Sequence, residues 1–395
     1  MTAIDVPIDE TITFEMLDRD PASVYQRLRR ENPIVRIKAI NRIVLTKADH
    51  VYLAKTDMVH FGSEDDQTPM QRAFGGHTLM RKDGEAHLKE RAAMTETFKV
   101  NHWACDWKNR FATHIDQVLD QLPTSGELEL SGKFAKPLVA RILNDLLGIE
   151  PDSEEQLFSW AKSLITGAMN ASFDEKVFAI SDQANAEMNA CFDRMIEQHR
   201  AAPNPSVLSV MANAENPLPL SQIRTNMKIC IGGAAIEMRD ALLTVLHGLL
   251  QHPDQLASCQ QSRRWDLACE EGLRWVAPIQ ASPRIVKKEI ELDGVRLPAG
   301  ETIMAVQGSA NYDEDYWQNP EQFNMHRPFA AHQTFGAGPH RCMGENIYRR
   351  IMSELILPKF FARFPNAKPA QNSKVEFRGF AFRGPLELRV KLAEN

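Results

Sequence analysis

The segment Phe335-Gly336-Ala337-Gly338-Pro339-His340-Arg341-Cys342-Met343-Gly344 places a cysteine in a loop that is rich in glycine. The residues after it, from Glu345 to Met352, have the pattern of a helix. A loop that leads into a helix stabilises a thiolate, because free backbone N–H groups and the helix dipole favour negative charge there. Glycine also permits positive φ angles and a close approach of the backbone to a flat ligand. We therefore take Cys342 as the first candidate for a ligand.

The spacing Phe-Gly-x-Gly-x-His-x-Cys-x-Gly in this segment resembles the haem-binding loop of the cytochrome P-450 family. A lone cysteine beside glycine is more often an ordinary buried thiol, but here every defining position of the family motif is matched. The resemblance implies that Cys342 is the axial thiolate ligand of the iron in heme b, with Phe335 against the cofactor. It also implies a mainly α fold with small β-sheets, the triangular cytochrome P-450 fold, as a single domain over residues 1–395. In that fold the haem lies between the long central helix and the cysteine-loop helix.

The composition indicates a globular protein. The chain has 395 residues, of which 43% are hydrophobic and 25% are charged, and its net charge of −6 gives no basic surplus for nucleic acid. The first twenty residues are acidic and lack the apolar core of a signal peptide, and no run of 18 apolar residues predicts a membrane span. We therefore expect a cytoplasmic protein of the soluble bacterial type, whose six cysteines are reduced thiols.

The rest of the chain has a mainly helical pattern. We expect one helix from about 10 to 31 and a polar, irregular segment from about 56 to 80, which in the family covers the substrate. Small β-sheets are predicted at about 34–46, 284–306 and 375–391. In the last of these ranges, residues 375–377 and 386–390 are predicted to form a hairpin, whose tip would reach into the pocket.

A long helix is predicted from Ser221, its N-cap, to Gln251. Gly232 and Gly233 lie in its middle, where each costs about 1 kcal/mol relative to alanine. Close approach to a flat ligand would explain the two glycines, and so would ordinary tight packing between helices. The resemblance implies that this helix covers the oxygen side of the haem, with Gly233 next to it.

This helix departs from the family at one functional place. Most members carry an acid followed by threonine, which help deliver protons to bound oxygen, and the corresponding positions here hold Ile236 and Glu237. The positions three and four residues from Glu237, where a helical ion-pair partner would lie, hold Gly233, Ala234, Asp240 and Ala241. A carboxyl group pointing to solvent is the simpler interpretation. We favour a catalytic role for Glu237, as a partly desolvated acid that passes protons through water.

Several basic residues are candidates for the haem propionates. His87 and Arg91 are four residues apart and share one face of a helix, which by itself fits a solvated face equally well. With the cysteine loop present, they match the His-x-x-x-Arg pair of the family. The resemblance also implies that Arg284 and His340 lie near the propionates.

Glu271 and Arg274 have the Glu-x-x-Arg spacing, which in isolation predicts only a weak surface ion pair. In the family such a pair joins a later arginine in a buried triad that braces the cysteine loop. Arg327 fits that third place, so we expect a structural role for all three residues.

A narrower resemblance is to the guaiacol-type aromatic O-demethylases, which enclose a small methoxyarene with three phenylalanines. The chain is similar to them at 233–237, 271–275, 308–311 and 379–385. Phe74 and Phe382 match two of the three phenylalanines, while Ala168 occupies the place of the third and would leave room for a different substrate. Both phenylalanines could also be plain core residues. The substrate pocket is predicted to contain Phe74, Ala168, Ile236, Ile279 and Phe382.

These features predict a haem-thiolate monooxygenase that inserts one oxygen atom from O2 into a C–H bond of a small hydrophobic or aromatic substrate, with O-demethylation of a methoxyarene as one option. Electrons would come from NAD(P)H through a separate ferredoxin, a flavin reductase or both, with docking at Lys89, Lys99, Arg341 and Arg349. The alternatives are a peroxygenase that uses hydrogen peroxide and a hydroxylase of a terpenoid-like substrate. The complete set of motifs argues against a non-enzymatic haem sensor.

Overall fold

The computed structural model describes residues 4–65, 68–328, 330–371 and 373–392. The chain forms two compact units. Unit 1 combines the N-terminal region up to residue 64 with residues 240–345 and 367–391, and unit 2 consists mainly of residues 65–239 and 346–366. The mainly helical architecture with small sheets is confirmed, whereas the single domain over 1–395 remains a prediction.

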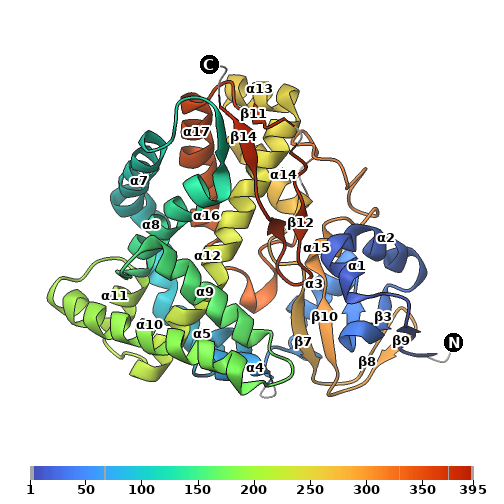
Figure 1. Cartoon of the computed structure of the whole chain (residues 1–395). Helices are drawn as coiled ribbons and strands as arrows, with labels where there is room; N and C mark the ends of the chain where they lie inside the picture. The colour runs from blue at the N-terminus through green and yellow to red at the C-terminus, as the bar shows by residue number, and fades with distance from the viewer. Residues whose placement is uncertain (1–3, 66–67, 329, 372, 393–395) are drawn as a thin grey trace. The chain divides into compact units, whose positions relative to one another are not determined.

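Unit 1 contains the principal sheet (Figure 1). In the described part of the chain its strand order is β2 (Ile8–Asp9), β3 (Ile34–Ile37), β4 (Arg42–Leu45), β10 (Thr302–Ala305), β7 (Ser282–Val286) and β5 (Phe61–Gly62). A smaller sheet has the order β1 (Ile4–Asp5), β9 (Val295–Leu297) and β8 (Ile290–Leu292). The predicted strands at 34–46 and 284–306 are therefore confirmed. β10 pairs parallel with β4 and antiparallel with β7, which joins the N-terminal strands to the segment that carries Arg284.

The side-chain alternation of these strands explains why the sheet is buried on both faces. Ile34, Ile43 and Leu45 belong to one core cluster, together with residues of α3 (Ala48–Thr56). Val35 and Val44, which point the other way, pack in a second cluster with residues of the N-terminal helices. Helices on either side of the sheet therefore account for the strongly apolar strands.

The single helix predicted from about 10 to 31 is wrong in its extent. The chain forms two helices, α1 (Phe14–Arg19) and α2 (Pro21–Glu31). Asp20 separates them, since its side chain accepts a hydrogen bond from Ser23 N and caps α2, while Pro21 occupies the first turn. An aspartate followed by proline is a helix-start signal that the sequence carried and the prediction overlooked.

The predicted C-terminal hairpin has a different pairing. β12 (Phe377–Arg378) pairs antiparallel with β13 (Gly384–Pro385), and β14 (Arg389–Lys391) pairs instead with β11 (Lys368–Pro369). The predicted hairpin is therefore confirmed around Phe377, and Leu386 N donates to Glu376 O (2.9 Å), but the predicted pairing of residues 387–390 is wrong. The loop between β12 and β13 is shorter than the predicted one, because Asp18 fixes both of its ends. Gly379 N donates to Asp18 Oδ1 (2.9 Å), and Arg383 Nη1 donates to Asp18 O (2.7 Å).

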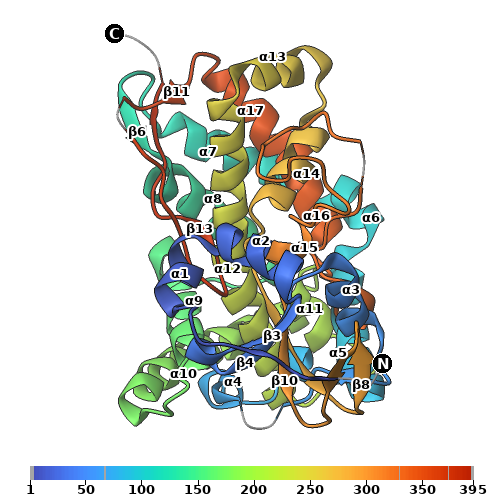
Figure 2. The same ribbon diagram turned by 90° about the vertical axis from the view of Figure 1, so that its right-hand side faces the viewer.

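Unit 1 also contains α13 (Pro253–Ser262), α14 (Trp265–Trp275) and α15 (Gln307–Ala310). Unit 2 is built mainly from helices, which Figure 2 shows together with β6 (Glu127–Glu129). They are α4 (Pro69–Ala73), α5 (Gly84–Thr95), α6 (Val100–His102), α7 (Lys108–Asp120), α8 (Lys136–Leu147), α9 (Glu154–Ala168), α10 (Glu175–Ala201), α11 (Val207–Ala212) and α17 (Leu357–Arg363). The helix after the cysteine loop, α16 (Glu345–Arg350), begins at the boundary between the units. α9 packs on α10 and on α4, so the helical pair α9–α10 supports the segment around Phe74.

The long helix α12 (Leu220–Gln251) is confirmed as one element and belongs to unit 2 up to Arg239 and to unit 1 from Asp240. Ser221 lies inside it and is not the N-cap; Gln222 N and Ile223 N donate to Pro219 O instead. Gly232 is required by packing, because a Cβ atom there would lie 3.0 Å from Phe74 Cζ. Of the two explanations offered for the glycines, close packing accounts for Gly232.

Candidate active site

Cys342 lies in a tightly turned loop at the start of α16, and its side chain is exposed. Its backbone N–H donates to Phe335 O (2.9 Å), and Gly336 N–H donates to Gln333 O (2.9 Å). Gly336 has a φ of 74° and Gly338 a φ of 67°, backbone angles that residues other than glycine rarely adopt. Cys342 thus lies in a turn that its glycines make possible, with its side chain accessible to solvent.

Gly338 also needs to be glycine because of its neighbour. A Cβ atom on Gly338 would lie 2.2 Å from the carbonyl oxygen of Lys55, near the end of α3. The cysteine loop is therefore packed directly on α3, backbone against backbone. Any larger residue at this position would displace the loop that carries Cys342.

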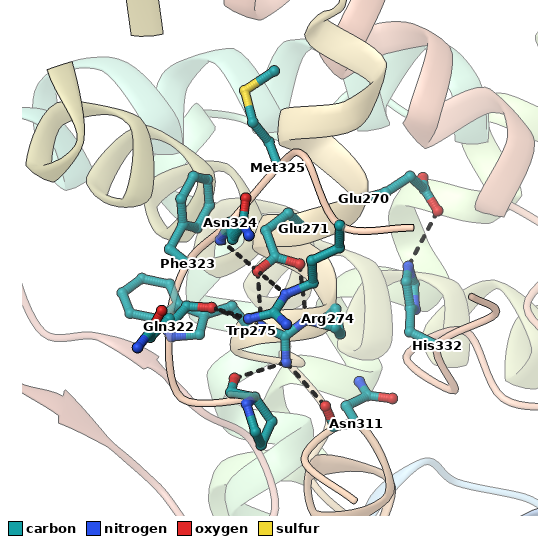
Figure 3. A network of polar contacts seen from close by, with 12 residues as sticks. Glu270, Glu271, Arg274, Trp275, Asn311, Gln322, Phe323, Asn324, Met325 and His332 are labelled. Carbon is teal, nitrogen blue, oxygen red and sulfur yellow. Dashed lines mark hydrogen bonds and ion pairs between the residues drawn. The ribbon is translucent and has the colours of Figure 1, made fainter. Parts of the chain in front are cut away.

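The predicted triad of Glu271, Arg274 and Arg327 comes together in the structure. Figure 3 shows its Glu271–Arg274 pair. The Glu271 carboxylate accepts two hydrogen bonds of 2.8 Å from Arg274 and one of 3.0 Å from Arg327 Nε. Glu271 is 5% exposed and Arg274 is 1% exposed, so this is a buried pair and the weak surface interpretation is excluded. The Arg274 guanidinium also lies over the rings of Tyr312 and Trp317.

A chain of hydrogen bonds connects the triad with the cysteine loop. Arg274 Nη1 donates to Asn311 O (3.0 Å), and the Asn311 side chain accepts from Gln333 N (2.7 Å) and donates to Thr334 Oγ1 (2.8 Å). Thr334 and Gln333 immediately precede Phe335, whose carbonyl accepts from Cys342 N. The triad therefore braces the loop from outside through Asn311, a residue that sequence reasoning assigned no role.

Two predicted propionate contacts lie in unit 1. Arg284 is on β7, 8% exposed, and His340 is half-buried in the short 3-10 turn before Cys342. Lys55, which the sequence analysis missed, is 1% exposed and donates to Gln307 Oε1 (2.9 Å). Burial and the nearby charge of Arg284 place the pKa of Lys55 well below its usual value. Lysine is rarely buried completely, so only the structure could have revealed it.

The other two predicted propionate contacts lie in unit 2, on α5. His87 is 1% exposed and Arg91 is half-buried. Glu90, between them in sequence, accepts hydrogen bonds from Lys82, Gln222 Nε2 (2.9 Å) and Asn226 Nδ2 (3.0 Å). This network fixes α5 against the first turns of α12.

On α12, Glu237 and Gly233 share one face. A Cβ atom on Gly233 would lie 3.6 Å from Glu237 Oε1 and would meet nothing else within 4 Å in the described part of the chain. The Glu237 carboxylate thus lies along the open face that Gly233 creates. One residue further on, Met238 O accepts a hydrogen bond from the Tyr348 hydroxyl (3.3 Å), so α12 is tied to α16 next to the predicted catalytic residue.

Three predicted pocket residues lie in unit 2. Phe74 is completely buried, and its ring packs against Gly232 and therefore on α12. Ala168 is half-buried at the end of α9; its neighbour Gly167 packs so closely on Ala73 that an added Cβ atom would lie 2.8 Å from Ala73 Cβ. Ile236, one helical turn beyond Gly232, is also half-buried. Phe74 and Ala168 are thus brought into one neighbourhood.

The remaining pocket candidates, Ile279 and Phe382, meet in unit 1. They form an isolated antiparallel bridge, flanked by the hydrogen bonds from Gln280 N to Ala381 O and from Arg383 N to Pro278 O, each 2.8 Å long. Both side chains are half-buried. The tip of the C-terminal hairpin is therefore held on the chain that follows α14.

The donor set fits an iron porphyrin. An exposed cysteine at the start of a helix is a suitable axial ligand, and the positive-φ glycines shape the loop around its sulfur. Arg284 and His340 in unit 1, and His87 and Arg91 in unit 2, supply basic groups of the kind that bind carboxylates.

The chain matches the family model of cytochrome P-450 from residue 11 to residue 383. It belongs to the cytochrome P-450 family. Membership makes haem the cofactor and makes the protein a cytochrome P-450 monooxygenase, in agreement with the cysteine loop. None of the helices in the described part of the chain is long and apolar enough to cross a bilayer.

Two relatives with assigned activities share less than a third of their residues with this chain over the aligned regions. The steroid C26-monooxygenase of Mycobacterium tuberculosis is 29% identical over 311 residues, which cover 75% of this chain and 80% of that protein. The 6-deoxyerythronolide B hydroxylase of Saccharopolyspora erythraea is 26% identical over 300 residues, covering 74% of this chain and 72% of the other. Among solved structures, CYP109E1 from Bacillus megaterium in complex with testosterone has a TM-score of 0.84 at 22% identity, covering 95% of this chain and 100% of that chain. The fold is confirmed by this match.

Proposed function

We propose that this cytochrome P-450 hydroxylates a C–H bond of a compact hydrophobic substrate, using Cys342 as the axial thiolate. The observation that carries the proposal is the exposed Cys342 in a loop that is shaped by positive-φ glycines and braced by the buried Glu271 triad. The overall reaction consumes the C–H bond, O2, two electrons and two protons, and yields an alcohol and water. The haem supplies the activation of O2, which a thiolate ligand favours by electron donation.

The residues around the cofactor divide into binding and proton-handling groups. His87, Arg91, Arg284 and His340 would bind the propionates, and Phe335 and Gly233 would lie against the porphyrin. Glu237 is the proposed proton carrier. Its carboxylate lies on the open face of Gly233, and it occupies the position where most family members have the threonine hydroxyl. A carboxyl group that is partly removed from water has a raised pKa and can donate protons near neutral pH.

The proposed substrate is terpenoid-like or steroid-like. Two relatives of the chain are named for activity on steroids and on 6-deoxyerythronolide B, which are hydrophobic, non-aromatic ring compounds. Ala168 in place of a third aromatic ring would give such a molecule room beside Phe74.

O-demethylation of a methoxyarene is the second candidate, because Phe74 and Phe382 match two of the three phenylalanines of the guaiacol-type enzymes and each is fixed by its surroundings within its own unit. Hydroxylation of the methyl carbon would give a hemiacetal, which collapses to formaldehyde and a phenol. In either case, electrons are proposed to come from NAD(P)H through a ferredoxin, a flavin reductase or both.

The two candidates can be separated with testosterone and guaiacol as probes. The haem-loaded protein is titrated with each compound, and loss of iron-bound water is followed as a shift of the main haem absorption band. Turnover is then measured with NADPH and a surrogate ferredoxin pair, and separately with hydrogen peroxide alone. A hydroxysteroid supports the first proposal, and formaldehyde from guaiacol supports the second. Equal rates with peroxide alone would identify a peroxygenase, and no product from a broad terpenoid and methoxyarene panel would contradict both.

A further inference from the structure

The segment that carries Phe74 is held by a buried lysine. Lys228, on α12, is 2% exposed, and its Nζ donates to Phe74 O (3.4 Å). Asn185, on α10, is 8% exposed and donates from Nδ2 to the carbonyl oxygen of Ala73 (2.8 Å). These two carbonyls end the short helix α4, where unsatisfied C=O groups attract donors and positive charge.

The same two side chains converge on the next residue. Gly75 has a φ of 66°, and a Cβ atom there would lie 3.3 Å from Lys228 Nζ and 3.5 Å from Asn185 Oδ1. At Gly76, a Cβ atom would lie 2.6 Å from the hydroxyl of Thr225, which is also on α12. We call Lys228, Asn185 and Thr225 the Phe74 clamp, because they surround the backbone from residue 73 to residue 76.

The clamp also determines where the Phe74 ring lies. Lys228 and Gly232 are four residues apart on α12 and therefore adjacent on one face. Lys228 fixes the Phe74 carbonyl, and Gly232 leaves the space that the ring occupies. Ile236, another predicted pocket residue, is the next residue on this face. The Lys228 hydrogen bond to the Phe74 backbone and the space at Gly232 that receives the Phe74 ring are thus one helical turn apart.

Burial of the Lys228 ammonium group costs desolvation free energy, so the presence of a lysine here requires an explanation. Burial, together with the nearby charge of Arg224, lowers the pKa of Lys228 to about 8. In the described part of the chain Lys228 pairs with no carboxylate, and Asn185 Oδ1 is buried without a hydrogen-bond donor. A methionine of similar length would fill the same volume without the desolvation cost, so packing alone does not explain the lysine.

We propose that Lys228 is a positioning residue for substrate selection: by holding the backbone at Phe74, it sets how far the Phe74 ring extends over the pocket. The inference rests on the proposed place of Phe74 in the substrate pocket and adds a residue that contacts no substrate itself. Loss of the Lys228 hydrogen bond would allow the α4 end to move and the ring to withdraw, which enlarges the pocket.

Two haem ligands of different size, imidazole and 4-phenylimidazole, measure this effect without knowledge of the natural substrate. Dissociation constants are obtained from the absorption change of the haem for wild type, Lys228→Met, Lys228→Arg and the exposed control Lys162→Met. We expect Lys228→Met to shift the affinity ratio toward 4-phenylimidazole by about tenfold. Lys228→Arg should restore most of the wild-type ratio, and Lys162→Met should leave it unchanged.

The decisive comparison repeats Lys228→Met in a Phe74→Ala background. If Lys228 acts through the ring, its substitution there no longer changes the ratio, a non-additivity expected of coupled residues. An equal change in both backgrounds, or a lowered melting temperature with an unchanged ratio, would overturn the inference. Should Lys228→Met fail to fold, Asn185→Ala replaces it in the same design. The carbon monoxide spectrum of the wild type is a separate readout: loss of its thiolate signature would contradict the proposed function and not the role of Lys228.

Discussion

The brace of the cysteine loop in unit 1 and the Phe74 clamp in unit 2 both fix a short backbone segment with buried cations, but they balance charge differently. In the brace, Arg274 and Arg327 share the Glu271 carboxylate and donate to backbone carbonyls as well. In the clamp, the hydrogen-bond partner of Lys228 among the described residues is a neutral group, the Phe74 carbonyl. We therefore expect the brace, which holds the loop of the proposed iron ligand Cys342, to contribute more to stability than the clamp, which holds the segment proposed to select among substrates.

The largest effect is expected from removing one charge of the brace. Arg274→Met leaves Glu271 buried with one fewer partner and frees the Asn311 carbonyl, which should lower the free energy of unfolding by about 3–5 kcal/mol. Chemical denaturation measures this loss, and the haem spectrum should show less thiolate-bound iron. Arg264→Met, which breaks only an exposed ion pair with Asp266, is the control and should cost less than about 1 kcal/mol. If both variants lost the same free energy of unfolding, the brace would be no more stabilising than an exposed ion pair, which would contradict this account.

A somewhat smaller effect is expected in unit 2 at Glu90, which is 6% exposed and accepts from Lys82, Gln222 and Asn226. Glu90→Met leaves these donors unsatisfied and should cost about 2–3 kcal/mol of stability. Because the cysteine loop does not depend on this network, the carbon monoxide spectrum of folded protein should keep its thiolate signature. Loss of that signature at a stability cost similar to that of Arg274→Met would show that the two regions are not independent.

Glu237→Gln tests proton delivery, because glutamine has nearly the same side-chain shape as glutamate but does not act as an acid. We expect kcat with O2 and a reductase to fall about 100-fold, within the range that general acid–base groups contribute, while ligand affinity at the haem stays the same. Glu197→Gln, on the exposed face of α10, is the matched control. An unchanged kcat, with no extra release of hydrogen peroxide, would mean that Glu237 carries no protons.

The last expected effect appears only on acidification: a dependence of stability on pH in unit 1. His247 lies between Trp275 and Phe377, with ring centroids 5.9 and 5.6 Å away. Burial, and then the charge of His252, lowers the pKa of His247 from 6.5 to about 4. The unfolded chain therefore binds more protons between these values, so the neutral imidazole contributes full stability above pH 6.5 and loses it as the pH falls toward 4.

The loss should amount to about 3 kcal/mol at most by pH 4, and His247→Phe should reduce it. Melting temperatures of both proteins between pH 4 and 7 measure the difference. Parallel pH profiles for the wild type and the variant would exclude His247 as the cause.

The sequence predicted the elements that follow local rules. The cysteine loop, the long helix, the strands at 34–46 and the Glu-x-x-Arg pair have short-range patterns, and the structure places them as expected. The prediction failed where two local signals competed. The apolar spacing predicted one helix from about 10 to 31, but the Asp20-Pro21 pair divides it into α1 and α2. The second strand of the C-terminal hairpin was predicted too far along the chain because Asp18, about 360 positions away, fixes the turn at Gly379.

The missed residues share a property that sequence patterns do not report. Lys55, Lys228, Asn185 and Asn311 are polar residue types that usually lie at the surface, and each is buried by contacts from distant parts of the chain. Their roles depend on which carbonyl group faces them, as with Lys228 and Phe74 O or Arg274 and Asn311 O. Such pairings are tertiary, so no spacing within the sequence reveals them.

The most direct test of the account is the spectrum of the reduced, carbon monoxide-bound protein with and without the sulfur of Cys342. The wild type should show the strongly red-shifted haem band of thiolate-bound iron, because the cysteine loop presents Cys342 as the axial ligand. Cys342→Ser, verified by circular dichroism to be folded and reconstituted with haem, should lose that band together with all O2-dependent turnover. A variant that keeps the red-shifted band would contradict the assignment of Cys342 and the function derived from it.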